Sequence, residues 1–158
     1  MPRYAWIAVL VLVADQAAKA WAQAALAGGR IIVAPFFNLT LVHNTGAAFG
    51  LLRDAGGWQN AFFIAVALAV TVFIGVYLRR LGPGERQLGL ALTLVLGGAL
   101  GNLVDRLLRG YVVDFIDLYY RGWHWPAFNL ADTAITCGAV LLVADALGWR
   151  LIGRGGRG

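Results

Sequence analysis

The 158-residue chain contains no serine, one cysteine and two histidines. The absence of serine excludes a serine hydrolase. A single cysteine cannot form an internal disulfide bond, and Cys137 lies in an apolar stretch where a lone thiol behaves as a small apolar side chain. His43 and His124 are few for a zinc site without carboxylates, and there is no H-E-x-x-H motif. Any hydrolytic chemistry must therefore come from aspartates.

Charge is also scarce: 13% of the residues are charged, 60% are hydrophobic, and the mean hydropathy is +0.71. A soluble domain of this length would need more polar surface. A bilayer core about 30 Å thick requires roughly 20 apolar residues per helix. The pattern predicts a mainly α-helical membrane protein, a single integral membrane domain over residues 1–158. Its four transmembrane helices are expected at about residues 4–26, 61–78, 87–104 and 126–149.

The net charge of +5 comes from arginines at particular places. Those that flank span ends on one side of a four-span chain are Arg3, Arg79, Arg80, Arg86, Arg150, Arg154 and Arg157. Short loops rich in arginine and lysine stay cytoplasmic. We therefore expect both termini and the 79–86 turn inside, and residues 27–60 and 105–125 outside. The basic excess is a topology signal, and no nucleic-acid partner is expected.

The two outer segments differ in character. Residues 30–43 are rich in β-branched and aromatic residues, which predicts short strands in a small β-sheet resting on the outer membrane surface. Pro35 confines this region to an edge or a bend. Residues 46–58 fit an interfacial loop or helix. The second outer segment carries five aromatic residues typical of the headgroup level, so we expect it to lie along the membrane. They are Tyr111, Tyr119, Tyr120, Trp123 and Trp125.

Ionisable residues inside a membrane cost at least about 2.5–3.5 kcal/mol each, so each is a functional candidate. Asp15 and Lys19 lie four residues apart and share one face of the first helix. They either form an internal ion pair that braces the bundle or contact substrate. Their charges also argue against a cleaved signal peptide, whose apolar region is uncharged. Asp145 is expected near the inner interface beside Arg150, outside the site.

Asn102, Asp105 and Arg106 lie where the third span reaches the outer face. Asn102 and Arg106 are four residues apart and share a helix face. Close approach of another helix is allowed by Gly97, Gly98 and Gly101. Two interpretations are open: a terminal salt bridge with tight packing, or a site in which Asn102 and Arg106 bind carbonyl groups.

Asp114 and Asp132 are the strongest catalytic candidates. Asp114 is embedded among apolar residues of the second outer segment, and Asp132 is expected about six residues into the last helix, roughly 9 Å below its start. Both can occupy the same depth just under the outer surface. Two carboxylates close together in a poorly solvated site tend to share one proton. Such a pair supplies a base that activates water and an acid that protonates a carbonyl or a leaving amine.

Five short strings carry a family resemblance. They are D-Q-A-A-K (15–19), N-T-G-A-A-F (44–49), G-N-L-V-D-R (101–106), V-V-D-F (112–115) and F-N-L-A-D (128–132). With these strings in this order, the chain closely resembles the lipoprotein signal peptidase family, also called signal peptidase II, from the first span into the fourth. The resemblance implies an aspartyl intramembrane endopeptidase of the bacterial cytoplasmic (inner) membrane, with its active site near the periplasmic face. Such enzymes remove the signal peptide of prolipoproteins, cleaving N-terminal to a diacylglyceryl-modified cysteine.

The resemblance also implies roles for individual residues. Asp114 and Asp132 match the catalytic dyad, which activates a water molecule. Positions that hold substrate are matched by Asn44, Asn102, Arg106 and Asn129. Supporting positions are matched by Asp15, Lys19, Gly46 and Asp105. The outer β segment resembles a cradle for the substrate. No metal and no organic cofactor are implied. The expected partners are the diacylglyceryl prolipoprotein, membrane lipid and globomycin-like peptide inhibitors, and we expect a monomer.

Two other classes of function fit parts of the pattern. In a small transporter or channel component, Asp15, Lys19 and the two candidate aspartates would form a proton or ion path, but no inverted repeat is detectable. In a scaffold protein, Asp114 and Asp132 would only hold the bundle together. Neither reading explains why the polar residues gather on one side of the bilayer.

Overall fold

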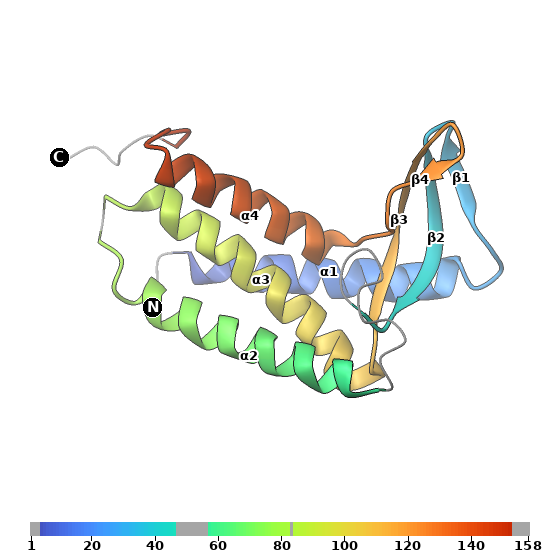
Figure 1. Ribbon diagram of the computed structural model, residues 1–158, viewed down its shortest axis with the longest axis horizontal. Helices are drawn as coiled ribbons and strands as arrows, with labels where there is room; N and C mark the ends of the chain where they lie inside the picture. The colour runs from blue at the N-terminus through green and yellow to red at the C-terminus, as the bar shows by residue number, and fades with distance from the viewer. Residues whose placement is uncertain (1–3, 47–56, 83, 153–158) are drawn as a thin grey trace.

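The computed structural model describes residues 4–46, 57–82 and 84–152. Within these residues a small antiparallel sheet stands across one end of a helix bundle (Figure 1). The helices are α1 (Ala5–Ala25), α2 (Trp58–Leu78), α3 (Arg86–Arg109) and α4 (Leu130–Ala146). The strands are β1 (Ile31–Ala34), β2 (Phe37–Asn44), β3 (Val112–Tyr120) and β4 (Trp123–His124). The predicted fold class, a mainly helical protein with a small sheet, is confirmed.

Three of the helices, α1, α2 and α3, are long and apolar enough to cross a membrane. The 17 residues of α4 are at the lower end of the lengths that span a bilayer core, so the fourth span stays a prediction. The helices expose large apolar side chains on their outward faces, among them Trp6, Phe73 and Val140. Extended apolar surface of this kind suits contact with lipid chains rather than with water.

The central helix of the bundle is α3, against which α1, α2 and α4 all pack. Its glycines make this possible. A Cβ atom at Gly101 would lie 2.6 Å from Oδ2 of Asp15 in α1, and one at Gly98 would collide with the carbonyl oxygen of Ala131 in α4. Gly97 lies equally close to α1. The prediction that these glycines allow close helix approach is confirmed, and it holds for two neighbouring helices.

The sheet has the strand order β1-β2-β3-β4, and each strand is antiparallel to its neighbours. β1 and β2 confirm the strands predicted from residues 30–43, and Pro35 lies in the turn between them. β3 was not predicted as a strand. Val112, Val113, Asp114 and Phe115 are all buried, so the sequence lacks the alternation that marks a strand with one exposed face. The segment expected only to lie along the membrane thus supplies the strand that carries Asp114.

Apolar side chains fix the sheet to the bundle. Phe115 of β3 packs with Ala22 and Leu26 at the end of α1, and Leu39 and Leu41 of β2 pack against the same cluster. β3 is therefore held at the ends of the helices rather than away from them.

The helix boundaries differ from the prediction where they matter most. α4 begins at Leu130, because Phe128 continues the sheet through a bridge to Ile116 of β3. The expectation that Asp132 lies about six residues into this helix is wrong: it is the third residue of α4. α3 runs on to Arg109, so the polar residues predicted at its end all lie within the helix. Of the expected interfacial loop or helix, residues 47–56 lie outside the described residues.

Candidate active site

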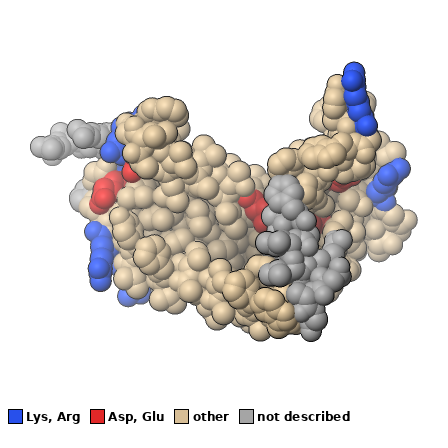
Figure 2. All heavy atoms as spheres, in the orientation of Figure 1, with Lys and Arg blue, Asp and Glu red and all other residues tan. Residues whose placement is uncertain are grey.

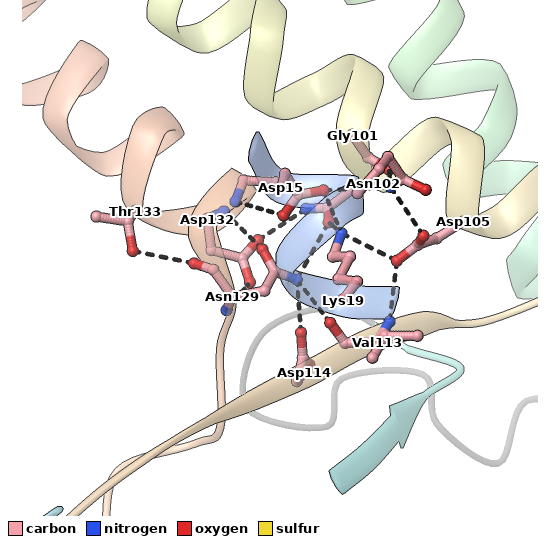
Figure 3. Close-up of polar contacts among 12 residues, drawn as sticks. Asp15, Lys19, Gly101, Asn102, Asp105, Val113, Asp114, Asn129, Asp132 and Thr133 are labelled. Carbon is pink, nitrogen blue, oxygen red and sulfur yellow. Dashed lines mark hydrogen bonds and ion pairs between the residues drawn. The ribbon is translucent and has the colours of Figure 1, made fainter. Parts of the chain in front are cut away.

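Asp114 and Asp132 lie where β3 passes the first turn of α4 and the end of α3 (Figure 3). Asp114 is placed by β3 and is only 1% exposed, whereas Asp132 is partly exposed. Both carboxylates contact Asn129, the residue that precedes α4. The structure thus brings both candidate aspartates into contact with one residue, although they lie on different elements, β3 and α4.

Asn129 is oriented by its place at the start of α4. As the N-cap residue it accepts a hydrogen bond through Oδ1 from the backbone N–H of Asp132 (2.9 Å), and its own N–H donates to Oδ2 of Asp132 (3.3 Å). This reciprocal capping box satisfies free N–H groups of the helix end. Because Oδ1 is committed to that bond, Nδ2 is left to donate to Oδ1 of Asp114 (2.7 Å). One asparagine therefore binds both carboxylates.

Asn102 of α3 holds the other oxygen of Asp132. Its Nδ2 donates to Oδ1 of Asp132 at 2.8 Å, while its Oδ1 accepts from Nζ of Lys19 at 3.0 Å. A lysine ammonium can only donate, so Lys19 fixes which end of the Asn102 amide faces the aspartate. This contact gives Lys19, predicted as a supporting residue, a specific position in the site.

Asn44 and Arg106 complete the surroundings of Asp114. Nδ2 of Asn44 donates to Oδ2 of Asp114 (3.0 Å), and Oδ1 of Asn44 accepts from the backbone N–H of Gly46 (3.0 Å). The guanidinium of Arg106 donates to the carbonyl oxygen of Gly46 (3.0 Å) and lies 5.0 Å from the ring centre of Phe63. The four predicted binding residues, Asn44, Asn102, Arg106 and Asn129, are thus gathered around the two aspartates.

A buried ionic cluster lies behind the site. Lys19 is fully buried and lies 2.8 Å from Asp15 and 2.9 Å from Asp105, both also fully buried. Arg109 donates to Asp105 at 2.6 Å. The internal ion pair predicted for Asp15 and Lys19 is therefore present, and the salt bridge at the end of α3 is made by Asp105. Arg106 instead binds a carbonyl group.

The ionic cluster also ties separate elements to the site. Asp15 accepts a hydrogen bond from the backbone N–H of Ala131 in the first turn of α4 (2.9 Å). Asp105 accepts one from the backbone N–H of Val113, the residue before Asp114 (3.0 Å). Each aspartate of the cluster thus fixes the backbone next to one of the two candidate catalytic residues.

The electrostatic environment favours a shared proton. Burial, together with the nearby charge of Asp132, raises the pKa of Asp114 from 3.8 to about 7, although hydrogen bonds from Asn44 and Asn129 act in the opposite direction. A carboxyl with this pKa is half protonated near neutral pH and can donate a proton.

In the described part of the chain, no group of three or more His, Cys, Asp or Glu side chains is placed to hold a metal ion.

Comparison with known proteins identifies the family. Two solved structures, both described as a bacterial membrane enzyme, have TM-scores of 0.77 and 0.76 against this chain. The first is 31% identical and covers 97% of this chain and 92% of its own, and the second is 33% identical and covers 90% of each. The sequence model of the signal peptidase (SPase) II family matches residues 7–148. The chain belongs to the signal peptidase II family.

Relatives in this family are similar over most of their length. The lipoprotein signal peptidase of Shewanella baltica (strain OS155) is 52% identical over 145 residues, which is 91% of this chain and 85% of the relative. That of Burkholderia mallei (strain SAVP1) is 51% identical over 142 residues, 89% of this chain and 85% of the relative. As a signal peptidase II family member with long apolar helices, the protein is a multi-pass membrane protease.

In this signal peptidase II family chain, sequence reasoning missed one member of the ionic cluster, Arg109, and one hydrogen-bond partner of it, Gln16. Gln16 donates to the carbonyl oxygen of Gly101 and to Asp105, each at 3.1 Å. It lies within the D-Q-A-A-K string, which was the available signal. Arg109 is four residues after Asp105, a spacing that favours an ion pair on a helix.

Residues expected outside the site lie outside it. Asp145, in the last turn of α4, pairs with Arg150, which follows the end of the helix. His43 stacks near Tyr111, with ring centres 4.3 Å apart, and His124 pairs with Asp117. Neither histidine is hydrogen-bonded to Asp114 or Asp132 in the contacts described above.

Proposed function

We propose that this chain is the aspartyl endopeptidase that removes the signal peptide from bacterial prolipoproteins, cleaving N-terminal to the diacylglyceryl-modified cysteine. Membership of the signal peptidase II family supports the substrate class, and relatives named lipoprotein signal peptidase support it further. The observation that carries the catalytic assignment is the binding of Asp114 and Asp132 by one asparagine, Asn129, in a largely buried site.

In the proposed reaction Asp132 is the base. Its two oxygens accept hydrogen bonds from Asn102 and from the backbone of Asn129, and the N-terminal end of α4 favours a negative charge there. Asp114 carries the shared proton, in keeping with its burial and its pKa of about 7. The carboxylate of Asp132 takes a proton from water as the water oxygen attacks the scissile carbonyl carbon. Asp114 gives its proton to the carbonyl oxygen.

The tetrahedral intermediate then collapses. The carbonyl oxygen returns its proton to Asp114, the bond between carbon and nitrogen breaks, and the leaving amine takes the proton held by Asp132. Both carboxyls are thereby restored to their starting states. Within this scheme no metal and no organic cofactor is required.

Arg106 and Asn44 are proposed to bind the substrate peptide. Arg106 already binds one peptide carbonyl oxygen, that of Gly46, and its Nε is buried without a hydrogen-bond partner in the described structure. A further carbonyl group would satisfy that donor. Globomycin-like peptides, which carry the same groups, would compete for the site.

The proposed topology puts the site at the periplasmic face of the cytoplasmic membrane. Arg79, Arg80, Arg86 and Arg150 lie at helix ends opposite the sheet, where Figure 2 shows basic side chains at the left. Short basic loops stay cytoplasmic, which supports cytoplasmic termini. The diacylglyceryl chains of the substrate would remain in lipid while its scissile bond reaches the dyad. We also propose that the protein acts as a monomer.

The test is cleavage of a diacylated lipobox peptide by purified protein, with and without globomycin. Asp114→Asn and Asp132→Asn are each expected to lower kcat by about 10²- to 10⁴-fold, because each removes one proton-transfer group. Asp145→Asn is the matched control, because its ion pair lies at the opposite end of α4. Thermal unfolding of all variants checks that they are folded. Retained turnover in either dyad variant would remove that residue from catalysis.

A further inference from the structure

The edge of the sheet exposes an unusual amount of apolar surface. β1 is the end strand of the sheet, and all of Ile31, Ile32 and Val33 are exposed, by 42%, 65% and 53%. Consecutive residues point to opposite faces of a strand, so β1 is uncovered on both faces. Further exposed side chains around it are Phe36, Leu118, Tyr120, Trp123 and Trp125. We call residues 30–36 and 118–125 the sheet tip.

The exposed permanent charges on and around the sheet tip are all positive. In the described residues 27–46 and 110–129, the exposed side chains with a permanent charge are Arg30 and Arg121. Both carboxylates of these segments, Asp114 and Asp117, are buried. Burial raises the pKa of Asp117, but hydrogen bonds from His124 and Asn38 outweigh it and hold that pKa below 3.8. The negative charge is thus engaged inside the sheet, and the surface is left cationic.

The sheet tip overhangs the bundle. In Figure 1 the β1–β2 turn and β4 reach beyond the adjoining end of α4. Figure 2 shows blue Lys and Arg side chains projecting from this end of the molecule. In the proposed membrane orientation, the space under this overhang lies at the level of the lipid headgroups. Tryptophan and tyrosine prefer this level of a bilayer, and arginines near it attract anionic lipids.

We propose that the sheet tip is a docking surface for anionic phospholipids, with the apolar and aromatic side chains in the interface and Arg30 and Arg121 binding lipid phosphates. The occupant is lipid rather than a second copy of the chain for two reasons. The surface is continuous with a bundle whose outward faces are already apolar, and its exposed charges are all positive, which opposes pairing with an identical surface. This inference goes beyond peptide cleavage, because it uses none of the residues of the catalytic site.

The test places the full chain in nanodiscs of phosphatidylcholine with a minor fraction of phosphatidylglycerol. One of the two lipids at a time carries bromine on an acyl chain, and quenching of tryptophan fluorescence is measured. The contribution of the tip is the difference between wild type and Trp123→Phe/Trp125→Phe. The brominated lipid is present at the same mole fraction in both cases. Under this condition, brominated phosphatidylglycerol is expected to quench the tip signal more strongly than brominated phosphatidylcholine does.

Substitution of the two arginines tests the role of charge separately from that of the apolar surface. Arg30→Gln/Arg121→Gln should abolish the preference, since each arginine is expected to contribute about fivefold to anionic lipid association. Arg79→Gln/Arg80→Gln, at the opposite end of the bundle, should leave it intact. Thermal unfolding should be unchanged in both double variants, which checks that they are folded.

Three results would overturn the proposal. Equal quenching by both lipids in wild type would exclude anionic preference. A preference that survives Arg30→Gln/Arg121→Gln would exclude these arginines as the phosphate-binding groups. Absence of tip quenching by either lipid would exclude docking to lipid, and a dimer that depends on Trp123 and Trp125 would then assign the surface to a second copy of the chain.

Discussion

Three asparagines orient the two aspartates by the same device. In each of Asn44, Asn102 and Asn129, the side-chain oxygen accepts a hydrogen bond from a group that can only donate. The amide nitrogen is therefore left to donate to Asp114 or Asp132. The obligate donors are, in the same order, the backbone N–H of Gly46, Nζ of Lys19 and the backbone N–H of Asp132. A neutral amide fixed in this way holds a carboxylate without fully neutralising it, so the carboxyl group keeps its ability to exchange a proton.

The orientation of Asn102 is open to a direct test. Asn102→Asp keeps an acceptor for Lys19 but puts a carboxylate oxygen against Oδ1 of Asp132 in place of a donor. We expect kcat to fall by about 10²- to 10³-fold, as for loss of other positioned hydrogen-bond donors, with little change in KM. Asp145→Asn, at the far end of α4, is the control. An unchanged kcat would show that the Asn102 amide has no part in positioning Asp132.

The raised pKa of Asp114 predicts how activity changes with pH. In the proposed mechanism its protonated form is the acid, so kcat/KM should fall by about tenfold per pH unit above about 7. A variant outside the site, Asp145→Asn, should show the same profile. A rate that stays constant to well above neutral pH would assign the proton to a group other than Asp114.

The raised pKa of Asp114 also predicts how the free energy of unfolding changes with pH. The folded chain holds the proton of Asp114 more tightly than the unfolded chain, where a carboxyl titrates near 3.8. Its contribution to the free energy of unfolding is therefore fully present below about pH 4 and is lost as the pH rises through about 7. Asp114→Asn should lack this component of the pH dependence, which thermal unfolding in detergent would measure beside the activity profile.

At the scale of elements, the start of α4 and the glycine face of α3 decide where Asp132 lies. Asn129 caps the helix, and Gly98 lets α3 approach the carbonyl oxygen of Ala131 next to the cap. A side chain on Gly98 would have to push the first turn of α4 away from α3. Because Asn102 on α3 binds Asp132 across this contact, helix packing and site geometry are coupled.

Gly98→Ala is therefore expected to lower the free energy of unfolding by about 1–3 kcal/mol, as overpacking does, and to lower kcat as well. Gly75→Ala on α2 is the matched control, because nothing lies within 4 Å of a Cβ atom at that position. There the substitution should be neutral or stabilising, since alanine favours a helix over glycine by about 1 kcal/mol. Equal stability of the two variants, measured by thermal unfolding in detergent, would contradict close packing at Gly98.

How far the sequence predicts these elements depends on whether the signal is local. The Asp15–Lys19 pair and the glycine face of α3 follow from helical spacing and were found. The start of α4 was misplaced, although Asn129 and Asp132 have the three-residue spacing of a capping box. β3 has no such signal, because its first four residues are buried on both faces and do not alternate. The bonds from Asn102 and Asn44 to the aspartates join residues 30 and 70 positions apart, which spacing alone does not reveal.

At the scale of the whole molecule, the sheet and three helices meet at the buried ionic cluster. Lys19 of α1 contacts Asp105 of α3, Asp105 binds the backbone of β3, and Asp15 binds the backbone of α4. Four elements are thus fixed at the end of the bundle where Asp114 and Asp132 lie. The cluster contains two aspartates, Lys19 and Arg109, so its formal charges cancel. This balance makes the burial of Asp15, Lys19 and Asp105 beside the partly exposed Arg109 tolerable.

The balance predicts a non-additive response to substitution. Lys19→Met leaves Asp15 and Asp105 with only the partly exposed Arg109, and should lower the free energy of unfolding by about 3–5 kcal/mol. Lys19→Met/Asp15→Asn removes one charge of each sign, so the double variant should be more stable than the single one, with a coupling of about 0.5–3 kcal/mol. Both should remain low in kcat, because neither restores the donor that orients Asn102. Equal unfolding free energies for the single and double variants, measured in detergent, would show that charge balance does not hold these elements together.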